Sequence, residues 1–217
     1  MDELRKIKFI ILSRRMVENI APYPGPHIII SVRTPGDPEE AQLPISDQTL
    51  ATLRLVFMEE YDHSEDKSWQ EYHQKLIKQG HAFTEDTGRL VLDFAARYAD
   101  DIEAVIAHCD AGMARSPAIS FALSKTVFSG YESEIMAVPW EKDYELDKEF
   151  DAGKKPSIYD SLQLRDFGSR PPTCYQSILD AWQEQMRPPP LSKDGHDRPC
   201  YYCGEPCNSL AGKTGKL

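Results

Sequence analysis

The sequence predicts an α/β fold with a mainly parallel central sheet flanked by helices. Three observations support this prediction. Short apolar runs rich in Ile and Val recur along the chain, as expected for strands that are buried on both faces of a sheet. Segments with helical apolar periodicity lie between and after these runs. Stretches rich in Pro and Gly, such as PYPGP and RTPGDPEE, follow two of them as turns.

Four segments fit buried strands. They are KIKFIILS (6–13), HIIISV (27–32), a strand within ATLRLVF (51–57) and EAVIAH (103–108). The loops that follow the carboxyl ends of parallel strands hold the ligand sites of such folds. We therefore expect chemistry at the residues that follow position 107.

Three helices are predicted with defined ends. They are TEDTGRLVLDFAARYA (84–99) with Thr84 as its cap, SPAISFALSKTVF (116–128), and TCYQSILDAWQEQM (173–186). In the second of these, Ser116 fits the N-cap position and Pro117 the first helical position. Shorter helices are expected within residues 14–26 and 58–82. Residues 129–170 are charged and weakly periodic, and they receive no assignment.

The length of 217 residues fits one domain with a tail. We place a single domain at residues 1–187, and a Pro-rich linker with a Cys-containing tail at residues 188–217. In that tail, Cys200, Cys203, Cys207 and His196 have spacings compatible with zinc binding. A zinc ribbon needs a second Cys pair that the tail lacks, so a tail with free thiols is the alternative. The prediction is no metal and no cofactor.

The charge balance sets limits on the partners. The chain has 35 acidic residues against 25 Lys and Arg, a net charge of −10. Nucleic acids and anionic membranes would repel such a chain, so neither is an expected partner. The sequence has no apolar run of membrane-spanning length, no secretory signal, and an odd number of cysteines, five, with three near the C-terminus. We expect a cytoplasmic protein that acts as a monomer.

The most informative stretch is HCDAGMARSPA, residues 108–118, at the end of the fourth predicted strand. Small residues after Cys109 allow the backbone to curl and to direct several N–H groups inward. The positive end of the following helix points at the same place, so the loop is suited to bind an anion. Arg115 adds a planar set of donors that suits two phosphate oxygens. The same field favours the thiolate form of Cys109.

These parts together fit covalent phosphoryl transfer. A thiolate beneath a bound phosphate is placed for in-line attack, and the transfer itself needs mainly positioning and charge stabilisation. A phosphocysteine would form and water would then remove it. Departure of the leaving group also needs a proton from a nearby carboxylic acid.

The Cys-(five residues)-Arg spacing, preceded by His and followed by Ser, resembles the signature of the cysteine-based protein tyrosine and dual-specificity phosphatases. The segment HCDAGMARSPA is most similar to the corresponding segment of small bacterial and viral dual-specificity-like phosphatases. The segments FIILSRR, PHIIISVRTPGDPE, LRLVF and CYQSILDAW resemble parts of that group in the same order. The resemblance covers roughly residues 6 to 186. It implies the three-layer fold of the tyrosine phosphatases.

The resemblance implies a role for each matching residue. Cys109 would be the nucleophile, and Arg115 would bind phosphate and stabilise the transition state. Ser116 would hydrogen-bond the sulfur and help it leave in the second step, and His108 would support the loop and the thiolate. The phosphate oxygens would be held by the backbone amides of Asp110, Ala111, Gly112, Met113, Ala114 and Arg115.

The general acid departs from the family pattern. The family takes an Asp from the loop after the third strand, where its small bacterial members often have Phe-Asp-Asp. This chain has FMEEYD, so Met58 and Glu59 stand where the Asp residues would be. The candidates are Asp62, Glu59 and Glu60, and residue type favours Asp62. A solvated acidic loop with no catalytic role is the alternative.

Two functions therefore remain open at this point. The first is a cysteine-dependent hydrolase acting on phosphotyrosine or phosphoserine/threonine of proteins, or on another phosphomonoester. The second is a phosphate-binding interaction module of the same fold with weak or no turnover. The position of the acidic side chains relative to Cys109 would discriminate between them.

Overall fold

The computed structural model describes residues 4–37, 39–58, 67–138, 140–159, 162–164 and 173–186. The chain divides into two compact units, Met1–Trp182 and Gln183–Leu217. The first unit contains the sheet and the candidate site. In the second unit the description covers residues 183–186, which end the last helix. The predicted boundary between residues 187 and 188, and the whole predicted tail, lie outside the described residues.

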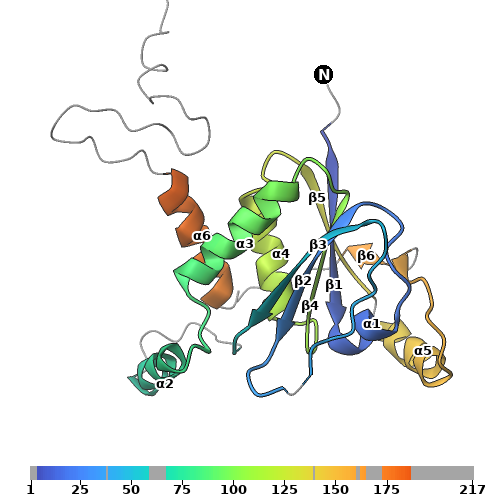
Figure 1. Ribbon diagram of the computed structural model, residues 1–217, viewed down its shortest axis with the longest axis horizontal. Coiled ribbons are helices and arrows are strands. Elements are labelled where there is room, and N and C mark those ends of the chain that lie inside the picture. Colours follow the sequence, from blue (N-terminus) through green and yellow to red (C-terminus); the bar gives the residue numbers. More distant parts are fainter. Residues whose placement is uncertain are drawn as a thin grey trace, which may run out of the picture. The chain divides into compact units, whose positions relative to one another are not determined.

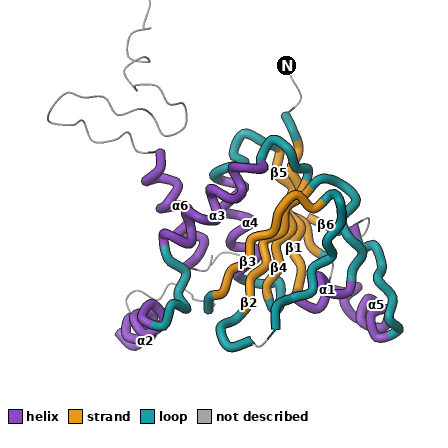
Figure 2. Tube along the Cα trace, in the orientation of Figure 1, coloured by secondary structure: helices purple, strands orange, loops and turns teal. Residues whose placement is uncertain are grey.

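A six-stranded sheet in the order β3-β2-β4-β1-β5-β6 forms the centre of the first unit (Figure 2). Its strands are β1 (Lys6–Ser13), β2 (His27–Arg33), β3 (Thr49–Val56), β4 (Ala104–Cys109), β5 (Glu132–Ala137) and β6 (Gln163–Leu164). Neighbouring strands from β3 to β5 pair in parallel, and the two-residue β6 pairs antiparallel with β5 at the edge. The predicted mainly parallel α/β fold is confirmed.

Six helices are described: α1 (Arg14–Asn19), α2 (Lys67–Lys78), α3 (Glu85–Tyr98), α4 (Arg115–Lys125), α5 (Trp140–Asp151) and α6 (Thr173–Met186). Five of them, all except α5, lie within or overlap the five predicted helical segments, and Thr84 caps α3 as predicted, its hydroxyl accepting a hydrogen bond from the amide of Thr87. Residues 129–170 contain β5, α5 and β6, none of which was predicted. The strand ESEIMA is only partly buried, and its mixed polar composition hides its extended structure.

Two apolar clusters cover the two faces of the sheet and make three layers. One cluster joins alternate residues of β1, β2 and β4 to α3, α4 and α6. The other joins the remaining alternate residues to α1, α5 and the segments around Tyr23 and Ile158. Figure 1 shows α3, α4 and α6 on one side of the strands and α1 and α5 on the other. No helix in the described part of the chain has the length and apolar character needed to cross a membrane.

Two strand-to-helix junctions lie side by side at the carboxyl ends of the central strands. β1 and β4 are parallel neighbours, with Ser13 paired to Cys109 at their carboxyl ends. The chain passes directly from β1 into α1, and from β4 through residues 110–114 into α4. The residues that follow β4 therefore lie beside the start of α1, at the edge where sites form in parallel sheets.

Candidate functional site

The loop between β4 and α4 is held tightly against β1. Gly112 has φ +70°, a left-handed conformation that other residues rarely adopt. A Cβ atom at Gly112 would lie 2.9 Å from the carbonyl carbon and oxygen of Leu12 and from the amide nitrogen of Ser13. The backbone amide of Arg14 donates to the carbonyl of Asp110 at 3.1 Å. Glycine is thus required at position 112 for both conformation and space.

The start of α4 differs from the prediction. The N-cap position is occupied by Ala114, which makes no side-chain capping bond, and the helix begins at Arg115. The prediction that Ser116 caps the helix is therefore wrong. Its hydroxyl instead donates to the sulfur of Cys109 at 3.2 Å, and Ser116 itself is fully buried. Without a capping side chain, the N–H groups of the first helical turn are left for another acceptor.

Arg115 is a buried cation with an incomplete set of partners. The residue is only 4% exposed. Its Nη1 donates to the carbonyl of Phe57 at 3.0 Å, and its Nη2 donates to Oδ2 of Asp110 at 2.5 Å. Its Nε is buried and has no hydrogen-bond partner among the described residues. Because an unpaired buried donor is costly, this atom is a candidate donor to a bound acceptor.

The Asp110 side chain links three segments. Its Oδ2 accepts hydrogen bonds from Thr34 Oγ1, at 2.5 Å, and from Arg115. Burial raises the pKa of Asp110, but these two hydrogen bonds and the charges of Arg115 and Arg14 outweigh burial, so the pKa lies below its ordinary value. Asp110 is therefore a carboxylate at neutral pH, and it neutralises part of the Arg115 charge.

Cys109 lies at the end of β4 in the apolar cluster shared with α4, and it is 2% exposed. The other described cysteine, Cys174 at the start of α6, belongs to the same cluster. Burial raises the pKa of Cys174 to about 12, so it stays a thiol at neutral pH. On the outer side of the loop, Met113 is 67% exposed. Of the two described cysteines, Cys109 is the one whose sulfur accepts a hydrogen bond from the hydroxyl of Ser116.

His108 faces the other side of the sheet from Cys109. Its Nε2 is 2.8 Å from the hydroxyl of Ser31 on β2. Burial lowers the pKa of His108 to about 4, and the charge of Arg14 acts in the same direction. The imidazole is therefore neutral at neutral pH. Its contribution to the loop is a fixed contact between β4 and β2 rather than a positive charge.

The three general-acid candidates, Asp62, Glu59 and Glu60, lie outside the described residues. The residue Phe57, shortly before them in the sequence, belongs to the site, because its carbonyl accepts the hydrogen bond from Arg115 Nη1. The next amide, that of Met58, donates to the carbonyl of His81 at 2.8 Å. The zinc candidates Cys200, Cys203, Cys207 and His196 also lie outside the described residues. Within the described part, no three His, Cys, Asp or Glu residues gather as a metal site.

Sequence reasoning missed three contributors to this site. Thr34 and the carbonyl of Phe57 come from two other strand ends, and only the order of strands in the sheet brings them to the loop. The side chain of Asp110 could have been suspected, because a carboxylate five residues before a buried Arg within one tight loop is placed to pair with it. Of the run predicted to bind phosphate, residues 110–114 form the loop after β4, and Arg115 begins α4.

Comparison of the chain with family models, with curated proteins and with solved structures gives no match.

Proposed function

We propose that this chain is a metal-independent phosphomonoester hydrolase that acts through a phosphocysteine intermediate, as a protein tyrosine or dual-specificity phosphatase. The observation that carries the proposal is the buried Arg115, whose Nε has no partner among the described residues and which begins α4 directly after the loop that follows Cys109. A phosphate dianion at this position would accept from Nε and from the uncapped first turn of α4.

In the first step, the Cys109 thiolate attacks the phosphorus atom of the bound ester. The S–P bond forms as the bond from phosphorus to the ester oxygen breaks. Arg115 and the loop amides stabilise the charge on the phosphoryl oxygens. The departing oxygen takes a proton from a carboxylic acid, for which Asp62, Glu59 and Glu60 are the candidates.

In the second step, water attacks the phosphocysteine, the S–P bond breaks, and inorganic phosphate leaves. The sulfur departs as an anion, and the Ser116 hydroxyl that donates to it at 3.2 Å stabilises that charge. The water loses a proton to the carboxylate that served as the acid in the first step.

The proposed substrate is a phosphotyrosine or a phosphoserine/threonine of a protein, with other phosphomonoesters as alternatives within the same chemistry. The resemblance of HCDAGMARSPA to the dual-specificity-like phosphatases supports this class. We also propose that the protein is cytoplasmic and monomeric. The net charge of −10 disfavours nucleic acids and anionic membranes as partners.

A second candidate function is phosphate binding without turnover. The observation that favours it is the pairing of Asp110 with Arg115. This carboxylate occupies one donor of the guanidinium that a phosphate would otherwise use. The replacement of the usual Asp residues by Met58 and Glu59 points in the same direction, because the first step is slow without a proton donor.

The test is hydrolysis of para-nitrophenyl phosphate from about pH 5 to pH 8 in EDTA, by the native chain and by Cys109→Ser. We expect turnover by the native chain that EDTA does not reduce, and none by the variant. Activity that EDTA removes, or that Cys109→Ser retains, would contradict the thiol mechanism. A native chain that binds vanadate or phosphate but shows no turnover would support the binding module instead.

A further inference from the structure

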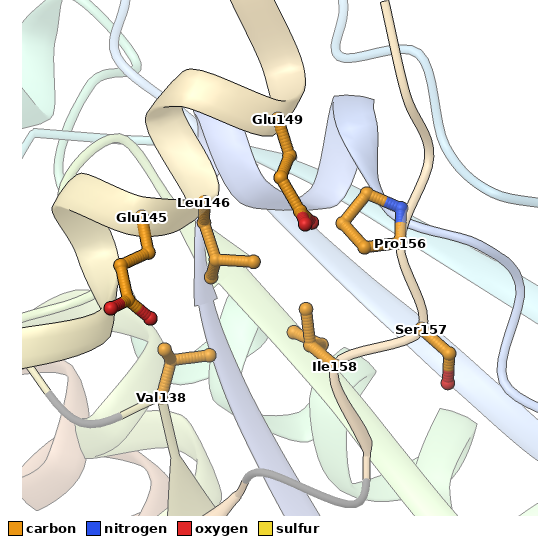
Figure 3. Close-up of a pocket in the computed structure, with 7 residues that line it drawn as sticks. All are labelled: Val138, Glu145, Leu146, Glu149, Pro156, Ser157 and Ile158. Carbon is orange, nitrogen blue, oxygen red and sulfur yellow. The ribbon is translucent and has the colours of Figure 1, made fainter. Parts of the chain in front are cut away.

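A separate hollow lies between α5 and the segment that follows it, outside the loop of Cys109. It has a volume of about 180 Å³ and is lined by Val138, Glu145, Leu146, Glu149, Pro156, Ser157 and Ile158. Figure 3 shows the side chains of Glu145, Leu146 and Glu149 descending from the helix, opposite Pro156 and Ile158. The hydroxyl of Ser157 points away from the others in this view.

The hollow combines an apolar floor with two carboxylates. Val138 and Ile158 are almost fully buried, at 3% and 2% exposure. Glu145 and Glu149 are four residues apart, so they lie on one face of α5. An apolar floor beneath a pair of negative charges suits a long side chain with an aliphatic stem and a cationic end, which is the chemistry of Lys and Arg.

The other acidic residues of this part of α5 already have a cation. Arg15 of α1 contacts Asp147 at 3.1 Å and Asp151 at 3.0 Å. Glu145 and Glu149, in contrast, have no ion-pair partner among the described residues. Glu145 is exposed and Glu149 partly exposed, so both carboxylates are open to a cationic group of a bound molecule.

Helix α1 connects the hollow to the loop of Cys109. At its start, the amide of Arg14 donates to the carbonyl of Asp110, and just after its end the amide of Ala21 donates to the carbonyl of Pro156. The six residues of α1 span about 9 Å, and two extended residues follow, so these two backbone contacts, one on the loop after Cys109 and one at Pro156 of the hollow, are about 10–15 Å apart. An extended peptide covers that distance in about three to five residues at about 3.3 Å each.

We propose that this hollow is a specificity subsite that receives a Lys or Arg side chain of a phosphoprotein substrate, about three to five residues from the phosphorylated residue. The inference rests on the proposed function, because the phosphorylated residue must occupy the loop of Cys109. The phosphate would fix one point of the peptide, and the basic side chain would fix a second.

The experiment uses the full chain carrying Cys109→Ser, so that binding is measured without turnover. The probes are fluorescein-labelled phosphotyrosine peptides of Ala and Ser in which a single Arg is moved through each position on either side. Fluorescence anisotropy gives the dissociation constants. The test variant adds Glu145→Gln and Glu149→Gln. The matched control adds Asp93→Asn and Asp101→Asn, two exposed residues on α3 and before β4, so that the net charge changes equally.

We expect Arg at one of the positions three to five residues away to tighten binding about fivefold, the effect of about 1 kcal/mol for solvent-accessible ion pairs. The Glu145→Gln/Glu149→Gln variant should lose this preference, and the control should keep it. Equal binding at every Arg position, or a preference that survives the double substitution, would overturn the subsite while leaving the phosphate site intact. Failure of every phosphopeptide to bind would overturn both the subsite and the proposed function. Cleavage of para-nitrophenyl phosphate, measured with Cys109 restored, should be the same in the Gln variant and the native chain.

Discussion

The two strand-to-helix junctions at the carboxyl ends of β1 and β4 have the same order of elements but differ in how their helix starts and arginines are hydrogen-bonded. Each begins its helix with an arginine, Arg14 in α1 and Arg115 in α4. At the first junction Ser13 caps the helix, and Arg14 contacts Glu18, Asp37 and the carbonyl of Glu39. At the second junction the helix has no side-chain cap, and one donor of the buried Arg115 has no described partner. The first junction has partners for its capping and guanidinium groups, whereas the second leaves one arginine donor and the start of its helix without a described side-chain partner.

The largest effect should come from exchanging the two arginines for lysine. Arg115→Lys removes the planar set of donors from the buried site, so we expect kcat/KM for para-nitrophenyl phosphate to fall by about 10³-fold or more. Arg14→Lys changes a partly exposed residue whose partners lie outside the proposed phosphate site, and its effect should stay within about tenfold. Similar losses in the two variants would remove the distinction between the junctions.

The second comparison concerns two glycines with the same backbone conformation. Gly112 and Gly80 have φ of +70° and +68°, but a Cβ would meet backbone atoms at 2.9 Å only at Gly112 and nothing within 4 Å at Gly80. Thermal unfolding should show that Gly80→Ala costs about 1 kcal/mol, the price of the left-handed conformation alone. Gly112→Ala should cost about 2–4 kcal/mol, because overpacking against β1 is added. Equal costs would contradict the crowded loop.

The third comparison exchanges the two serines for alanine. Ser116→Ala leaves the Cys109 sulfur without its hydroxyl donor, so phosphocysteine hydrolysis should slow by about 10- to 100-fold and a burst of nitrophenol should precede steady state. Ser13→Ala removes a helix cap, so it should lower the unfolding free energy by about 1 kcal/mol and leave kcat unchanged. A burst in the Ser13 variant, or none in the Ser116 variant, would argue against these roles.

The last prediction concerns the pH dependence of stability and His108. Its pKa is about 4 in the folded chain against 6.5 ordinarily, so the unfolded chain binds the proton first as the pH falls. The unfolding free energy should therefore decrease by about 3 kcal/mol between about pH 6.5 and pH 4. Urea unfolding of the native chain and of His108→Gln should differ in this slope, with the variant shallower. Parallel pH dependences would show that His108 is not buried as a neutral ring.

The sequence was sufficient for the fold class and for the succession of strand, loop and helix around Cys109. Ile-rich β1 and β2 are buried on both faces, so their composition alone identifies them. The strand β5 within residues 129–170 could not be predicted, because it is half-exposed and polar. Thr34 and the Phe57 carbonyl could not be found, since each reaches the loop from another strand.

The role of Ser116 shows how local rules give way at a functional site. Ser before Pro is a typical helix start, and it predicted an N-cap at position 116. The hydroxyl instead donates to the sulfur of Cys109, and the helix begins at Arg115, two residues before the predicted first position, without a side-chain cap. The local capping preference therefore gives way to a tertiary hydrogen bond with Cys109, which sequence-local rules do not include.

The most direct test of the central claim is to look for phosphate on Cys109 itself. The native chain and Ser116→Ala would be mixed with para-nitrophenyl phosphate, quenched within one turnover, and measured by intact-protein and peptide mass spectrometry. We predict a single added phosphoryl group on the peptide that contains Cys109, with more of it in Ser116→Ala. Turnover without any phosphorylated Cys109, or a phosphoryl group on another residue, would contradict the account of the β4–α4 junction as a covalent phosphate site.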